Sequence, residues 1–211
     1  AHTKGRFEAR QSKPVSMVTP NLMWAIDPGN SICGICLLGG NTIRAWEVPP
    51  ERAFDLIMEE SGGSPGQVAI EDMTGYSVPL SKDVIETCKL IGVLAYRFGQ
   101  VAAVYLVTRG MIKKAIFEAV PAVCIPRIEA KIAAKHRRSI AKGEKGMLNK
   151  DGNMRSPSFH YVDDRIVIAA VKEVLNIPTP KPGKRNIYGL TGHSWQALAV
   201  ACYRAGIFGN I

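Results

Sequence analysis

The stretch that most constrains this chain is residues 24–31, where an apolar run ends in an aspartate and a turn follows at once. Trp24, Ala25 and Ile26 lead into Asp27, Pro28-Gly29 reverses the chain, and residues 35–38 form a second apolar run. This pattern predicts a β-hairpin with a carboxylate at the end of its first strand. Because burying an unpaired carboxylate is costly, we expect a cation or hydrogen-bond donors to share the site with Asp27.

The rest of the chain predicts an α/β domain. Strands are expected at residues 23–27, 31–38, 42–48, 67–72 and 101–107, and helices at residues 51–60, 81–98, 111–119, 162–176 and 193–205. Ser81 is the expected N-cap of the second helix, and Glu71 ends its strand as Asp27 does. Three hairpin-linked strands followed by two crossover units predict a mixed five-stranded sheet flanked by helices, which matches the ribonuclease-H-like architecture.

The composition indicates one basic domain. The 211 residues carry a net charge of +9, which favours a polyanionic partner such as nucleic acid, the alternative being a basic protein with no such role. We expect one domain over residues 21–211 and a disordered, basic tail over residues 1–20. No apolar run approaches the roughly 18 residues of a membrane span, and no signal peptide is visible.

Cysteine usage indicates a reducing compartment. Five cysteines, an odd number, argue against a disulfide framework. Cys33 and Cys36 form a CxxC pair without a second Cys/His pair at zinc-finger spacing. We therefore expect both to pack within a strand rather than to bind metal.

A basic segment interrupts the pattern before the penultimate helix. Residues 131–150 carry seven Lys/Arg against one Glu, so we interpret about residues 127–160 as an insertion, partly helical and partly mobile. It is either an arm that contacts phosphates or a solvated loop. The candidate DNA contacts here are Lys135, Arg137, Arg138, Lys142 and Lys145.

Five motifs, taken in order, carry a resemblance to a known family. They are Ile26-Asp27-Pro28-Gly29, Ala69-Ile70-Glu71, Val107-Thr108-Arg109-Gly110-Met111-Ile112-Lys113-Lys114, the stretch 164–177, and His193-Ser194-Trp195-Gln196-Ala197-Leu198-Ala199-Val200. Their order and spacing resemble the RuvC family of Holliday junction resolvases over about residues 22–205. The tail and the basic insertion fall outside the match.

The resemblance implies a nuclease that uses two Mg²⁺ ions about 4 Å apart, with Mn²⁺ as a substitute. It assigns as ligands Asp27, Glu71 and two positions three residues apart on the last helix, here His193 and Gln196. Gln196 departs from the family, because it offers a neutral oxygen where an acid is expected. The protein works natively with fewer acids, or Asp72, Asp163 or Asp164 supplies the missing charge, or Gln196 is an engineered replacement.

The resemblance also implies the DNA contacts and the assembly. Arg109, Lys113 and Lys114 are expected to contact the cleaved strand, and Tyr76, or alternatively Met73, to enter the open centre of a junction. We expect a homodimer that makes paired nicks in four-way (Holliday) junctions, in a cytoplasmic or other reducing, DNA-containing compartment of bacterial or bacteriophage origin.

Three alternatives to a resolvase stay open. The first is a protein that binds branched DNA without cutting it. The second is another ribonuclease-H-like nuclease, one that cuts RNA–DNA hybrids or flaps. The third is a sugar-kinase or actin-like ATPase, which would need a second copy of the Asp-x-Gly hairpin and a longer chain.

Overall fold

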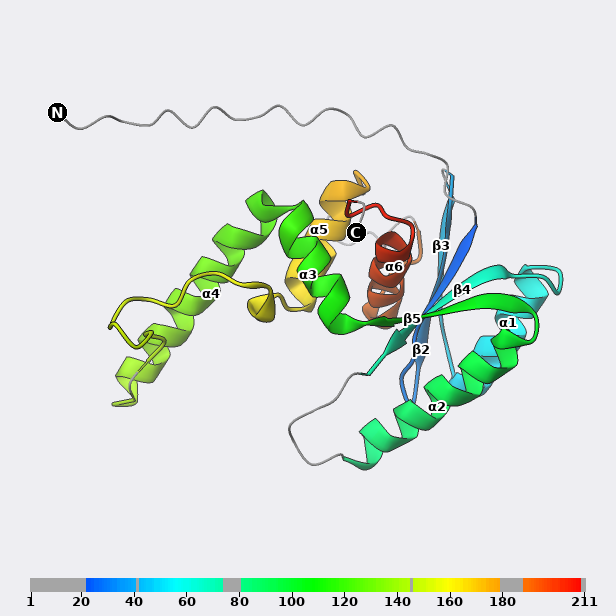
Figure 1. Cartoon of the computed structure of the whole chain (residues 1–211), viewed down its shortest axis with the longest axis horizontal. Helices are drawn as coiled ribbons and strands as arrows, with labels where there is room; N and C mark the ends of the chain where they lie inside the picture. Colours follow the sequence, from blue (N-terminus) through cyan, green and yellow to red (C-terminus); the bar gives the residue numbers. More distant parts are fainter. Residues whose placement is uncertain (1–21, 41, 74–80, 145, 179–187, 210–211) are drawn as a thin grey trace.

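The computed structural model describes residues 22–40, 42–73, 81–144, 146–178 and 188–209. Its centre is a five-stranded sheet in the order β3-β2-β1-β4-β5 (Figure 1). The strands are β1 (Met23–Asp27), β2 (Cys33–Gly39), β3 (Thr42–Val48), β4 (Gly66–Asp72) and β5 (Ala102–Thr108). The helices are η1 (Pro50–Arg52), α1 (Ala53–Glu60), α2 (Lys82–Gly99), α3 (Arg109–Ala119), α4 (Pro121–Ala141), η2 (Phe159–Tyr161), α5 (Asp164–Val174) and α6 (Gly192–Arg204).

The sheet is mixed, as the sequence predicts. β1 pairs antiparallel with β2 and parallel with β4, while β4 pairs parallel with β5. Opposite Ile26 of β1 lies Ile70 of β4, so the next residues, Asp27 and Glu71, leave the same end of two neighbouring parallel strands. The predicted architecture, a mixed five-stranded sheet flanked by helices, is confirmed.

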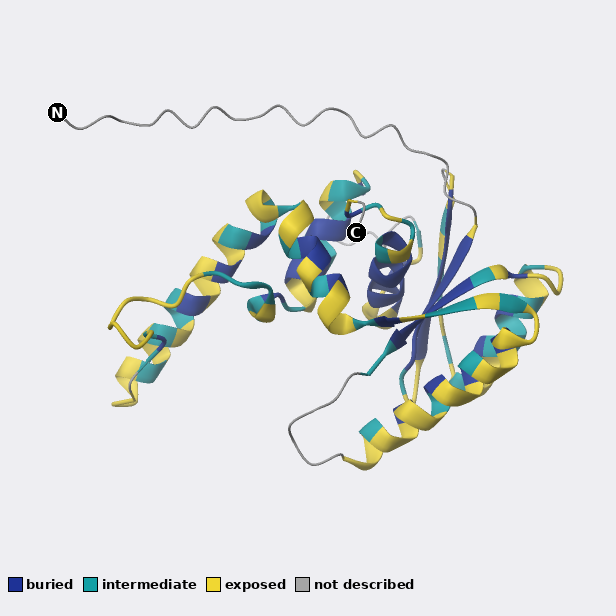
Figure 2. Cartoon of the chain, viewed as in Figure 1, coloured by how far each residue is buried: buried dark blue, intermediate teal, exposed yellow. Residues whose placement is uncertain are grey.

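Helices cover both faces of the sheet (Figures 1 and 2). On one face α1 and α2 bury a core that includes Ile26, Ile57 and Phe98, and on the other face α3, α5 and α6 bury the larger core. The central strands β1 and β2 are buried along their whole length, which explains why they appear as continuous apolar runs.

The two cysteines of the CxxC pair pack as predicted. Both are fully buried in β2, and Cys33 belongs to the core under α1 and α2 whereas Cys36 belongs to the core under α6. Residues three apart on a strand face opposite sides, so the pair does not point at one metal ion. All five cysteines are free thiols.

The first part of the basic insertion belongs to one long helix. α4 begins at Pro121, ahead of the predicted insertion, and continues without a break through residue 127 to Ala141. Its apolar side is buried through Cys124, Ile128 and Ile132, a four-residue spacing that leaves the opposite side of the helix exposed. Its far half points away from the sheet (Figure 1). The chain returns through a bridge between Leu148 and Met154 to η2.

Several expectations cannot be followed in the structure. The tail over residues 1–20, Tyr76 and Lys145 lie outside the described residues.

Ser81 caps α2 as predicted, since its hydroxyl accepts a hydrogen bond from the backbone N–H of Val84. Within the described ranges, no helix has the length and apolar character needed to cross a bilayer.

Candidate functional site

Asp27 and Glu71 meet in one pocket at the carboxyl ends of β1 and β4. The pocket has a volume of about 430 Å³. Its described lining residues are Asp27, Pro28, Glu71, Asp72, Met73, Thr87, Arg109, Gly110, Lys113, Phe159, His160 and His193. The lining therefore combines acidic groups from the sheet with basic groups from α3 and aromatic groups from η2.

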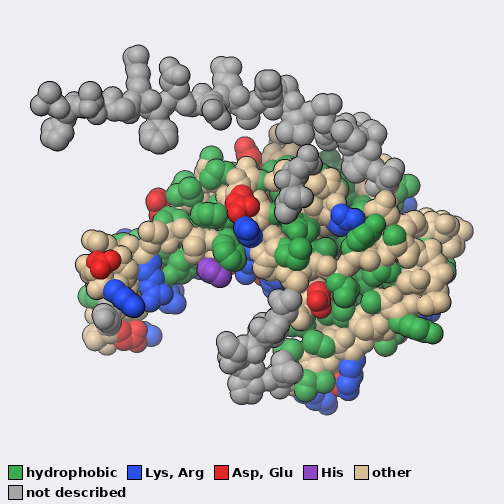
Figure 3. All heavy atoms as spheres, in the orientation of Figure 1, with side chains coloured by type: hydrophobic (Ala, Val, Ile, Leu, Met, Phe, Trp, Pro, Cys, Tyr) green, Lys and Arg blue, Asp and Glu red, His purple; other side chains and the backbone are tan. Residues whose placement is uncertain are grey.

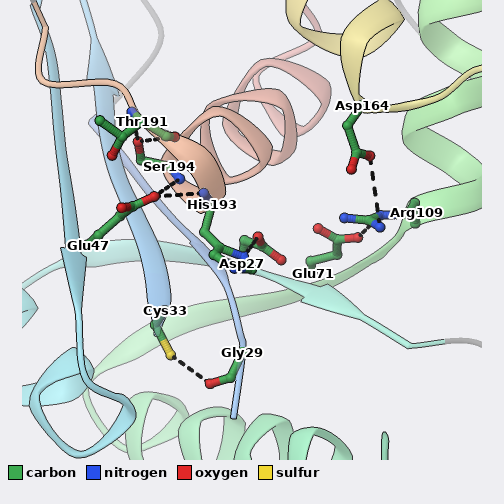
Figure 4. A network of polar contacts seen from close by, with 10 residues as sticks. All are labelled: Asp27, Gly29, Cys33, Glu47, Glu71, Arg109, Asp164, Thr191, His193 and Ser194. Atoms are coloured by element: carbon green, nitrogen blue, oxygen red, sulfur yellow. Dashed lines mark hydrogen bonds and ion pairs between the residues drawn. The ribbon is translucent and has the colours of Figure 1, made fainter. Parts of the chain in front are cut away.

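His193 is the third predicted residue that the fold brings to this place. Its Nδ1 lies 2.7 Å from Oδ2 of Asp27 (Figure 4), although the two residues are 166 positions apart in the chain. The imidazole is half exposed, whereas the aspartate is buried. The contact leaves the other ring nitrogen of His193 on the exposed side of the pair.

The close approach of α6 to the sheet depends on Gly34. Gly34 pairs with Asp27 across β1 and β2, and a Cβ atom added to it would lie 2.3 Å from the carbonyl carbon and oxygen of His193. A side chain at this position would push the first turn of α6 off the strand. The absence of a side chain at Gly34 therefore sets the place of His193.

Glu47 holds the beginning of α6 from the neighbouring strand. Its Oε1 accepts hydrogen bonds from the backbone N–H groups of His193, at 2.7 Å, and of Ser194, at 3.4 Å. Thr191 and Ser194 complete a capping box at the same helix end. A carboxylate at a helix N-terminus satisfies free donors and matches the helix dipole, so Glu47 positions the backbone that carries the imidazole.

Arg109 is the cation beside Glu71. As the first residue of α3, it donates from Nε to Oε1 of Glu71 at 2.7 Å, and its guanidinium lies 4.0 Å from Asp164 at the start of α5. Figure 4 shows the guanidinium between the two carboxylates. Arg109 thus connects a buried carboxylate of the sheet to the helix that follows the insertion.

The electrostatics of the carboxylate pair are unusual. Burial, and next the negative charge of Asp27, raises the pKa of Glu71 from 4.5 to about 7, against the opposing effect of Arg109. Burial also raises the pKa of Asp27, although His193 and Arg109 oppose the shift. Such shifts are typical of functional sites, where like charges share a buried place.

One oxygen of the pair has no partner. Glu71 Oε2 is buried and accepts no hydrogen bond from any residue that the structure describes. A buried polar atom without a partner is costly. Two buried carboxylates, one with an uncommitted oxygen, make a donor set that suits a hard divalent cation such as Mg²⁺. The residues present therefore fit the metal that the resemblance implies.

The ligand set is only partly gathered. Among the described residues, no group of three or more His, Cys, Asp or Glu side chains is arranged around one point. Asp72 lines the pocket. Asp164 is exposed and lies near Arg109, whereas Asp163 caps α5 and pairs with Lys131 at 2.8 Å.

Gln196 lies one turn after His193 on α6. It is buried, with 8% of its surface exposed, and it is not among the described residues that line the pocket. Positions three apart share a helix face, so Gln196 lies on the same face of α6 as His193.

The predicted DNA contacts divide into two groups. Lys113 lines the pocket, and burial, with the nearby charge of Arg109, lowers its pKa. Lys114 points elsewhere and pairs with Glu118. Met73 lines the pocket as well. Lys135, Arg137, Arg138 and Lys142 are exposed along the far half of α4, where Figure 3 shows a concentration of Lys and Arg side chains.

Sequence reasoning missed four side chains and one glycine of this site. Glu47, Thr87, Phe159 and His160 belong to segments without a motif. Gly34 carried a usable signal, because an isolated glycine inside an apolar strand indicates close approach of another backbone. Glu47 carried none, since its role depends on a helix 146 residues further along the chain.

Comparisons with known proteins give a distant structural likeness and no match by sequence. No protein-family model and no curated protein matches the chain. Among solved structures, the chain is similar to RuvC of Thermus thermophilus, with 17% identity, a TM-score of 0.45, and coverage of 88% of this chain and 93% of that one. It is similar to the same protein in complex with a Holliday junction substrate, again with 17% identity and a TM-score of 0.45, covering 87% and 92%. At this identity the function has to be inferred from the site of the chain itself.

Proposed function

We propose that this protein is a structure-selective DNA endonuclease that resolves four-way junctions by metal-dependent phosphodiester hydrolysis. The observation that carries the proposal is the buried Asp27–Glu71 pair in a pocket whose other wall is basic, with one Glu71 oxygen that has no hydrogen-bond partner among the described residues. The ordered motifs in the sequence support four-way DNA as the substrate. The carboxylate pair and the basic wall of the pocket support hydrolysis as the reaction.

Asp27 and Glu71 would hold the metal, with His193 beside them. When bound, Mg²⁺ supplies positive charge to the cleaved phosphate and lowers the pKa of a bound water. Asp27 and Glu71 contribute the negative charge that attracts divalent ions into the pocket. The imidazole of His193, oriented by its 2.7 Å contact with Asp27, can take up or release a proton at its free ring nitrogen.

Arg109 and Lys113 would orient the DNA strand. A guanidinium binds phosphate oxygens in a fixed planar geometry, and Arg109 already lies against Glu71. A phosphate held there is directly next to the carboxylate pair. Lys113, on the same pocket wall, adds a second positive charge to the strand path.

The far half of α4 would bind the arms of the junction. Its exposed Lys and Arg side chains project away from the sheet (Figures 1 and 3). Binding through such charges does not depend on DNA sequence. It weakens as the salt concentration rises, because releasing counterions from the DNA is then less favourable. A substrate defined by its shape rather than its sequence suits this kind of contact.

We also propose that the protein works as a homodimer. A junction needs two symmetric cuts, which a twofold assembly supplies. Exposed apolar side chains support this assembly: Ile85, Val93 and Tyr96 on α2, Val101 just before the edge strand β5, and Leu106 on β5. Sedimentation of the protein and of a Tyr96→Glu variant tests the assembly, with a smaller mass expected for the variant.

The test of the main proposal is nicking of a synthetic four-way junction. We expect paired nicks with Mg²⁺ or Mn²⁺ and little cutting of a linear duplex of the same sequence. Asp27→Asn should reduce cutting by at least about 1,000-fold and leave junction binding unchanged, because it removes a metal ligand but no basic contact. Cutting retained by Asp27→Asn would refute the site.

Gln196 supports a second candidate, a protein that binds branched DNA without cutting it. A neutral amide stands where the resembled family has an acid, so the ions would lose one compensating charge. Tight junction binding by the wild-type chain, with no nicks in Mg²⁺ or Mn²⁺, would favour this candidate. Gain of cutting in a Gln196→Asp variant would then attribute the inactivity to this position.

A further inference from the structure

The return of the basic insertion brings two aromatic side chains to the pocket. Phe159 and His160 of η2 line the same pocket as Asp27 and Glu71, and η2 packs against α3. These two residues lie in the segment outside the family resemblance. Their presence is therefore a property of this chain, and the proposed hydrolysis does not use them.

Contacts on both sides hold η2 in place. Lys131 of α4 donates from Nζ to the backbone carbonyl of Tyr161 at 3.1 Å and to Asp163 at 2.8 Å. Val162, directly after η2, is buried in the core. The backbone directly after His160 is therefore held by α4 and by the core.

His160 is the exposed member of η2. Its ring lies against Phe159 with the centroids 3.9 Å apart and the planes at 35°. It makes no hydrogen bond with any residue that the structure describes. One ring face is thus covered by Phe159, while the ring nitrogens are uncommitted in a pocket that also holds Arg109 and Lys113.

An uncommitted aromatic ring next to cations suits a nucleobase. Cations hold the phosphate, aromatic rings stack on the base, and ring nitrogens can form hydrogen bonds with base edges. The imidazole is too small to stack well unsupported, and Phe159 supplies a rigid support behind it. A flat ring and two cations that can hold a phosphate line the same pocket.

Resting on the proposed function, we propose that His160, supported by Phe159, stacks on the nucleobase next to the cleaved phosphate and determines which base the enzyme prefers there. His160 would then be a specificity residue, distinct from His193, which contacts Asp27. The preference arises only in the bound strand, because the pocket brings the ring and the phosphate site together.

The test measures stacking separately from cutting. 2-Aminopurine, whose fluorescence falls when it stacks, is placed at successive positions around the cut in a four-way junction bound to Asp27→Asn protein. We expect quenching at one flanking position, its loss in His160→Ala, and its retention in His160→Phe. Met154→Ala, an exposed apolar side chain of the same insertion outside the pocket, should leave the quenching unchanged.

Cleavage of junctions that vary at the quenched position completes the test. With the wild-type active site, His160→Ala should flatten the base preference by about 5- to 100-fold, and His160→Phe should keep cutting but change the preferred base. Quenching that persists in His160→Ala would overturn the inference, as would an equal loss of cutting on all bases. If the wild-type protein binds the junction without cutting it, the proposed nuclease activity is refuted but the stacking role of His160 is not, since the quenching assay needs only binding.

Discussion

Arg109 Nε lies 2.7 Å from Oε1 of Glu71, so the buried carboxylate already has a cation at one of its two oxygens. The other oxygen, Oε2, has no hydrogen-bond partner in the described part of the chain. A divalent ion bound by Glu71 would therefore share the carboxylate with a guanidinium. The two positive charges oppose each other, while the nearby Asp164 offers Arg109 an alternative partner.

Replacing Arg109 by glutamine should strengthen metal binding in the absence of DNA. Removing a positive charge at this distance favours a divalent ion by about 1–2 kcal/mol, or about 5- to 30-fold in Mg²⁺ or Mn²⁺ affinity measured by calorimetry. Junction cutting should nevertheless fall, because the phosphate contact is lost. Arg165→Gln, an exposed arginine of α5 outside the pocket, is the control. Unchanged or weaker metal binding would show that Arg109 does not compete for Glu71.

The raised pKa of Glu71 predicts how stability depends on pH without metal. The folded protein holds the proton up to about pH 7, whereas the unfolded chain releases it near 4.5. The folded state therefore loses about 3 kcal/mol as the pH rises through this window. A Glu71→Gln variant has no carboxyl group to ionise here. Its free energy of unfolding should therefore rise relative to that of the wild type between pH 5 and pH 8.

Urea unfolding in EDTA at both pH values measures this difference. The exposed Glu86, which pairs with Lys89 on α2, provides the control variant Glu86→Gln, and its difference from the wild type should not change with pH. If Glu71→Gln and the wild type show parallel pH dependence, Glu71 titrates normally and the buried pair is not electrostatically strained.

A methyl group at Gly34 should separate His193 from Asp27. The added Cβ would meet the backbone of His193 at 2.3 Å, so Gly34→Ala should lower stability by about 3 kcal/mol and reduce cutting even where the protein stays folded. Gly99→Ala is the matched control, because its Cβ meets nothing within 4 Å and alanine is the better helix residue. Thermal unfolding and nicking assays measure both effects. A Gly34→Ala protein with normal stability and activity would mean that α6 has room to shift.

Neutralising the far half of α4 should reduce the salt dependence of junction binding. Each lost phosphate contact lowers the slope of log K against log salt by about 0.9. The variant changes four exposed side chains to glutamine: Lys135, Arg137, Arg138 and Lys142. We expect the slope to fall by up to about 4 and Mg²⁺ binding to stay unchanged. The control is Arg44→Gln, which removes a cation of β3 that pairs with Glu60 and should leave the slope unchanged. An equal fall in slope for this control would show that the charge of α4 has no special part in DNA binding.

Much of the fold could be predicted from hydrophobic periodicity and capping residues in the sequence. The strands at residues 23–27 and 42–48 and the Ser81 cap were predicted as they are found, because hydrophobic periodicity and capping act between near neighbours in the chain. Other boundaries moved by one or two residues, as at Cys33 and Arg109. The insertion was less accessible, since a basic helix with a narrow apolar side resembles a solvated loop in the sequence.

The sequence by itself determined which residues carry the acids and that two of them each end a strand, because apolar runs and turn residues mark the ends of strands. Only the tertiary structure decided what surrounds them. Glu47 at the start of α6, Gly34 beneath it, Arg109 on Glu71 and His160 in the pocket all depend on contacts between segments distant in the chain. The physical reason is that periodicity reports the face on which a side chain lies, whereas the site depends on how closely separate elements approach, and that distance is set by packing.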